Sequence, residues 1–129
     1  MLTVLALHRP KNPDELNQEW ILVENTGAAP VKTQGCLVTV AARAQDRPHP
    51  VGTLDPGFVL QPKEKIRLVT GAPSKKAQGA PPDEKEAKNY HLCLREPILK
   101  KPGLVVRIAL GQLELGKATF SPEAKNGLG

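Results

Sequence analysis

Short apolar runs with a period of two dominate this sequence, and Gly, Pro, Asn and Asp separate them at nearly regular intervals. Alternation of apolar and polar residues is typical of β-strands, because successive side chains point to opposite faces of a sheet. The 13 prolines and 11 glycines stand between the runs rather than in repeats, which indicates many short elements joined by turns. The pattern therefore predicts an all-β fold.

Nine segments have this pattern, at residues 2–8, 18–25, 36–43, 51–54, 58–61, 65–70, 90–96, 104–110 and 113–120. Seven to nine strands of this spacing predict an immunoglobulin-like antiparallel β-sandwich that forms one domain over 1–120. A small barrel is the alternative architecture. We expect 71–88, which is rich in Pro, Gly, Lys and Ala, to be a mobile loop, and 121–129 to be a flexible tail. Residues 81–89 contain good helix formers without an apolar stripe, which predicts a solvated loop or surface turns.

The core must be mostly aliphatic, because 40% of the residues are hydrophobic but only 3% are aromatic. The single tryptophan, Trp20, alternates with Leu22, so we expect it to fill the space between two sheets as the largest core side chain. Glu19 and Glu24 are predicted to be charges at the rim of the sheet. Asn25-Thr26-Gly27 is predicted to be a hairpin corner whose glycine is free to adopt positive φ.

The order of several short motifs resembles the lamin tail domain, an immunoglobulin-like module of nuclear lamins and of many bacterial proteins. In this family an acidic-aromatic strand, an N-x-G turn, a P-V step and a glycine follow one another along the chain. The same order occurs here, at Glu19-Trp20, Asn25-Thr26-Gly27, Pro30-Val31 and Gly35. The later apolar strands of the family are similar to two further segments, FVLQPKEKIRLVTG and ILKKPGLVVRIAL. Cys36 stands where the family usually has a Trp, and Gly103-Leu104 where it usually has Gly-Asp. The resemblance covers about 2–120 and implies a module that contacts protein and sometimes DNA.

Basic residues give the chain a net charge of +5 and offer a second hypothesis about its partner. Five of them could form a stripe that contacts phosphate groups, namely Lys63, Lys65, Arg67, Lys75 and Lys76. Lys100 and Lys101 stand at another turn. Acidic residues interleave the 71–88 loop, and no aromatic side chain accompanies the lysines for stacking on bases. A solvated strand face that discourages edge pairing explains the stripe equally well.

Histidine and cysteine residues do not form a recognised reactive or metal-binding pattern. His8, His49 and His91 are far apart in sequence, and only His91 and Cys93 share a predicted strand face. A metal site there would need two further ligands, and a Cys-His nucleophile pair has no accompanying oxyanion signal. Cys36 and Cys93 are predicted to be small buried side chains, although a disulfide between them stays open. We therefore predict no enzyme activity, no metal and no cofactor.

These features favour a non-catalytic interaction module that binds a protein partner, or another copy of itself, through a sheet edge or the 71–88 loop. A weak, salt-sensitive nucleic-acid-binding domain is the alternative. No apolar run approaches the ~20 residues of a transmembrane helix, and the first residues are predicted to be a strand rather than a signal peptide. We expect a cytoplasmic protein without a small-molecule substrate.

Overall fold

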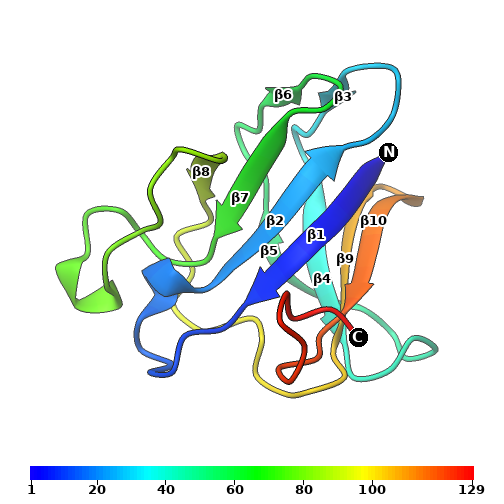
Figure 1. Cartoon of the computed structure of the whole chain (residues 1–129). Coiled ribbons are helices and arrows are strands. Elements are labelled where there is room, and N and C mark those ends of the chain that lie inside the picture. The colour runs from blue at the N-terminus through cyan, green and yellow to red at the C-terminus, as the bar shows by residue number, and fades with distance from the viewer.

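The computed structural model describes all 129 residues, which form two four-stranded β-sheets packed face to face and a small third sheet (Figure 1). The first sheet has the strand order β1-β2-β7-β8, the second has β10-β9-β4-β5, and the third pairs β3 with β6. The strands are β1 (Leu2–His8), β2 (Trp20–Asn25), β3 (Val31–Lys32), β4 (Leu37–Ala41), β5 (His49–Thr53), β6 (Val59–Leu60), β7 (Lys65–Val69), β8 (Lys88–His91), β9 (Val105–Leu110) and β10 (Leu113–Thr119). Two 3-10 helices, η1 (Leu16–Gln18) and η2 (Lys76–Gln78), lie in the connections, and neither has the length or apolarity to cross a bilayer.

This architecture confirms the predicted all-β sandwich, with ten strands rather than seven to nine. The additional strand is β3, whose two residues pair with the two residues of β6. One pair departs from the antiparallel pattern, because β8 runs parallel to β7. The 71–88 connection makes this possible, since its length lets the chain cross over and re-enter the sheet in the same direction.

The core lies between the two large sheets and is almost entirely aliphatic, as expected. Its main cluster has 18 buried residues, of which Phe120 is the only aromatic one. Strand alternation places Ile66 and Leu68 of β7 in this cluster, opposite Val106 and Ile108 of the second sheet. The inward face of β7 thus follows the period of two, although Arg67 and Val69 on its other face are buried as well.

The expectation that Trp20 fills this core is wrong. Trp20 is partly exposed, and the inward-facing apolar residues of β2 are its neighbours Ile21 and Val23. On the outer face its ring stacks on His8, with centroids 4.9 Å apart and an interplanar angle of 9°. The Arg67 guanidinium lies 4.8 Å from the Trp20 ring centroid. Both faces of β2 are partly apolar, so alternation alone did not show which face meets the second sheet.

The Asn25-Thr26-Gly27 turn is not a hairpin corner, because β2 pairs with β1 and β7 and the chain then passes to β3 in the third sheet. The Asn25 side chain is fully buried and donates hydrogen bonds to the carbonyl oxygens of Ala29 and Leu60, both at 2.9 Å. Its Oδ1 accepts a hydrogen bond from the Gly27 N–H at 3.0 Å. Gly27 does not adopt positive φ, since the buried asparagine holds the turn.

Residues 121–129 fold back on the sandwich. The Leu7 N–H donates to the Asn126 carbonyl at 2.8 Å, and Phe120 forms an isolated β-bridge with Leu128. Gly127 makes this approach possible, because a Cβ atom there would overlap the Leu7 carbonyl oxygen. The tail thereby forms one side of the site described below.

The 71–88 loop makes contacts with the rest of the protein that its composition did not indicate. The buried Asn17 side chain donates to the carbonyl oxygens of Ala72 and Gly79, at 2.9 and 3.0 Å. Ala87, near its end, is buried. Residues 81–87 contain no helix or strand, in agreement with the predicted loop, whereas residues 88 and 89 begin β8.

Candidate binding groove

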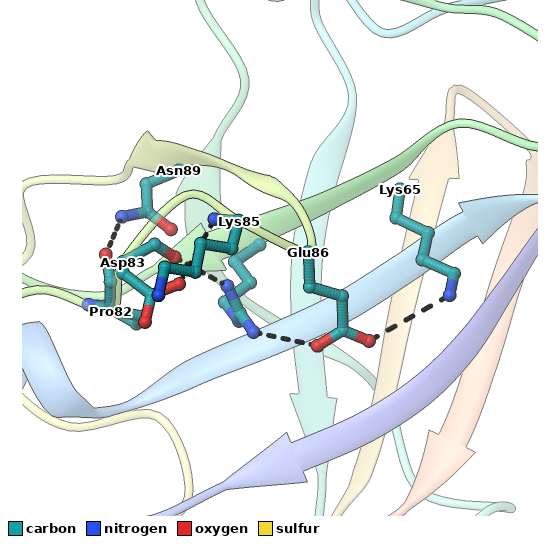
Figure 2. Close-up of polar contacts among 7 residues, drawn as sticks. Lys65, Pro82, Asp83, Lys85, Glu86 and Asn89 are labelled. Atoms are coloured by element: carbon teal, nitrogen blue, oxygen red, sulfur yellow. Dashed lines mark hydrogen bonds and ion pairs between the residues drawn. The ribbon is translucent and has the colours of Figure 1, made fainter.

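Two of the five predicted phosphate-contacting residues are engaged within the protein. The Glu86 carboxylate lies 3.9 Å from the Lys65 ammonium group and 3.1 Å from the Arg67 guanidinium. Figure 2 shows the Glu86 side chain directed toward Lys65. Arg67 also donates to the Asp83 carbonyl oxygen at 3.1 Å, and only 8% of its surface is exposed. Arg67 therefore stabilises the 82–87 segment against the first sheet and has little surface left for a phosphate group.

The other three predicted residues do not continue the stripe along β7. Lys63 precedes the strand in a turn with a φ of 69°, while Lys75 and Lys76 follow it at η2. All three side chains are exposed. The structure thus places the exposed members at opposite ends of the strand.

His91 and Cys93 do not share a strand face, because β8 ends at His91 and Cys93 adopts a φ of 55°. The His91 Nδ1 lies 3.0 Å from the Gly71 carbonyl oxygen. No group of three or more His, Cys, Asp or Glu side chains gathers at metal-binding distance. Both thiols are free; Cys36 is buried as predicted, and burial raises its pKa, whereas Cys93 is exposed, contrary to expectation.

A hollow of about 580 Å³ opens at one end of the sandwich, where three segments distant in sequence meet. They are the chain after β1, the loop around residues 97–100 and the folded-back C-terminal segment. We call this hollow the basic groove and define it by its four cationic lining residues, Arg9, Lys11, Lys100 and Lys125. All four side chains are exposed.

The floor of the basic groove is apolar and rigidly supported. Leu7, Leu99 and Phe120 line it, and each is at most 3% exposed. The Arg9 guanidinium lies 5.1 Å from the Phe120 ring centroid, and its Nη1 donates to the Leu99 carbonyl at 3.5 Å. This contact holds one cation over the floor, where a cation–π interaction is favourable.

Glu19 is the only acidic residue that lines the groove, and it is not the rim charge that the sequence predicted. It is 1% exposed, and its Oε1 accepts hydrogen bonds from the Thr70 hydroxyl at 2.6 Å and the Ile98 N–H at 2.7 Å. Its Oε2 accepts from the Leu99 N–H at 3.0 Å. Buried charges require such partners. Glu19 therefore anchors the loop that carries Lys100 to the first sheet.

Four prolines stand in the walls of the groove, and each has a φ fixed by its ring. They are Pro10, Pro13, Pro97 and Pro122. Fixed backbone torsions reduce the conformational entropy that a binding surface loses when it captures a ligand. The groove is therefore pre-organised as well as positively charged.

Sequence reasoning missed this site because its cations come from separate segments. Arg9 and Lys11 stand on either side of Pro10 in HRPKNP, and Lys100 stands in PILKKPG. Basic residues beside prolines are a local signal for charged side chains on stiff loops. Only the fold shows that the loops meet.

Comparison with known proteins assigns no family to the chain. No protein-family model matches it, and no curated protein matches it at a significant level. Its function is therefore inferred from the geometry and charge of its surface.

Proposed function

We propose that this protein is a non-catalytic interaction module that binds a partner protein in the basic groove. The observation that carries the proposal is the set of four exposed cations over an apolar floor, with the one lining carboxylate buried and hydrogen-bonded. Such a surface complements an acidic segment, because like charges are excluded and opposite charges are attracted over several ångströms. The resemblance to lamin tail domains, which are regarded as interaction modules, supports the same class of function.

The sequence also suggested a sheet edge or the 71–88 loop as the binding surface, and internal hydrogen bonds occupy the place where that loop meets the β8 edge. At the β8 edge the Asn89 N–H donates to the Glu84 carboxylate at 2.8 Å. The Asn89 side chain donates to the Pro82 carbonyl oxygen at 2.7 Å (Figure 2). A partner strand would have to displace these contacts, so the groove is the better supported site.

The groove also gives little support to catalysis. General acid–base chemistry requires a titratable group that can reach a substrate proton. Both oxygens of Glu19 are already engaged by donors of the protein. His8 also lines the groove, but its ring stacks on Trp20 and its Nδ1 lies 2.7 Å from the Gln18 carbonyl oxygen. The arrangement fits recognition of a charged segment better than proton transfer.

A random-peptide display library, selected against the full chain, tests the proposal. Selected peptides are measured by fluorescence anisotropy against Lys11→Glu/Lys125→Glu, and against Lys75→Glu/Lys76→Glu as a control with the same change of charge. We expect acidic peptides that bind the parent and control chains equally and the groove variant at least about tenfold more weakly. Peptides that bind the groove variant as tightly as the parent chain would refute the proposal.

Nucleic acid remains the second candidate, since Lys63, Lys75 and Lys76 are exposed and have no ion-pair partner. A salt titration against duplex DNA decides it. Affinity that falls steeply with salt and is lost in Lys75→Glu/Lys76→Glu supports this candidate. No binding at low salt eliminates it.

A further inference from the structure

A second hollow, of about 480 Å³, is lined in part by residues of the 95–101 loop. Its hydrophobic lining defines it as the apolar pocket and consists of Val40, Ala42, Val51, Leu94, Ile98 and Leu104. These residues come from the second sheet and from the connection between β8 and β9. None of them is aromatic, so the pocket suits an aliphatic side chain and offers no surface on which a nucleic-acid base could stack.

The two hollows are adjacent, because Pro97 and Lys100 line both of them. Between them the loop is held from below by Glu19, which accepts hydrogen bonds from the N–H groups of Ile98 and Leu99. The side chain of Ile98 lines the apolar pocket, and that of Leu99 lines the basic groove. The loop is thus a fixed ridge with an apolar hollow on one side and a basic one on the other.

The rim of the apolar pocket is also positively charged. Arg95, Lys100 and Lys101 line it and are exposed. The only acidic lining residue is Glu96, whose carboxylate is paired with the Lys100 ammonium group at 3.0 Å. Lys100 and Glu96 thus offset each other's charge. The cations of the rim without an ion-pair partner are Arg95 and Lys101, and they continue the positive surface that Arg9, Lys11 and Lys125 form in the groove.

We propose that the partner's segment is an acidic stretch that carries one aliphatic side chain and lies across residues 95–101. The aliphatic side chain enters the apolar pocket, and the neighbouring carboxylates face Lys100, Lys101 and the cations of the basic groove. This inference rests on the proposed function and adds to it the sequence pattern of the partner. Burial of one leucine side chain increases affinity roughly 10- to 100-fold.

Three fluorescein-labelled peptides of about ten residues test the inference by anisotropy with the full chain. The first contains Asp and Glu around one central leucine, the second has glutamine in place of the leucine, and the third keeps the leucine among lysines. We expect the first peptide to bind roughly 10- to 100-fold more tightly than the second, and the third not to bind.

A pair of protein variants tests whether the leucine side chain of the peptide binds in the apolar pocket. Ala42 is exposed, so Ala42→Phe obstructs the pocket without disturbing the core. Ala77→Phe, on the exposed turn of η2, is the matched control. We expect Ala42→Phe to abolish the preference for leucine over glutamine and Ala77→Phe to preserve it.

The outcomes separate this inference from the function on which it rests. Equal binding of the leucine and glutamine peptides overturns the inference. If Lys11→Glu/Lys125→Glu still weakens both peptides, the proposed function stands. Absence of binding by any acidic peptide at low salt overturns both.

Discussion

Replacement of Glu19 by glutamine perturbs the one side chain that joins the first sheet to the ridge between the two hollows. Three donors converge on its two oxygens, from Thr70, Ile98 and Leu99. A glutamine side chain has one oxygen, so its amide group faces at least one of these donors. That donor is left buried and without a partner.

The expected cost follows from these contacts. One unsatisfied buried donor costs about 1–3 kcal/mol, and loss of the charge weakens each of the two remaining hydrogen bonds by about 1 kcal/mol. Removal of the buried charge offsets part of this loss of stability, because a neutral amide costs less to desolvate than a carboxylate. We expect Glu19→Gln to lower the free energy of unfolding by about 2–3 kcal/mol. In urea the midpoint should fall by about 1–1.5 M for an m-value near 2 kcal/mol/M.

Urea unfolding and amide hydrogen exchange measure the two consequences. The exchange protection of the Ile98 and Leu99 amides should fall more than that of the central strands. Glu24→Gln is the matched control, because Glu24 lies on the outer face of β2, the strand that begins directly after Glu19, and has no side-chain hydrogen-bond partner. Its cost should stay within about 0.5 kcal/mol. A Glu19→Gln variant as stable as this control, with both amides still protected, would refute the reasoning.

Three further predictions follow from burial and backbone geometry. Acrylamide should quench the fluorescence of the partly exposed Trp20 in the folded protein; complete protection would contradict its outward position. A thiol reagent should modify Cys93 alone in the native protein and Cys36 only in denaturant, because Cys36 is buried and burial raises its pKa; simultaneous reaction would contradict this. Gly127→Ala should cost at least about 3 kcal/mol, because a Cβ atom there overlaps the backbone of β1. Gly103→Ala, with a similar φ of 83° but no atom within 4 Å, should cost only about 1–2 kcal/mol, and equal costs in unfolding experiments would count against the docked tail.

The strands could be predicted from the sequence because their signal is local. The run at residues 65–70 contains β7, whose alternating Ile66 and Leu68 join the core, and the run at residues 2–8 coincides with β1. The orientation of β2 could not be predicted, because residues on both of its faces are apolar. Which face meets the second sheet depends on buried polar partners such as Glu19 and Asn25, and these come from long-range contacts.

The candidate site was harder to predict for the same reason. Arg9, Lys100 and Lys125 are separated by most of the chain, and only sheet packing brings their segments together. Arg67 had the local pattern of an exposed strand cation, yet Glu86 and the Asp83 carbonyl engage it. Charge in a sequence predicts the sign of a surface, whereas the fold decides which charges are free.

Chemical-shift mapping of the isotopically labelled full chain with the leucine-containing acidic peptide tests the basic groove most directly. We expect the largest shifts of backbone amide signals at Arg9, Lys11, residues 98–101 and Lys125. Shifts confined to the β8 edge or the 71–88 loop, or no shifts at low salt, would contradict a partner site in the groove.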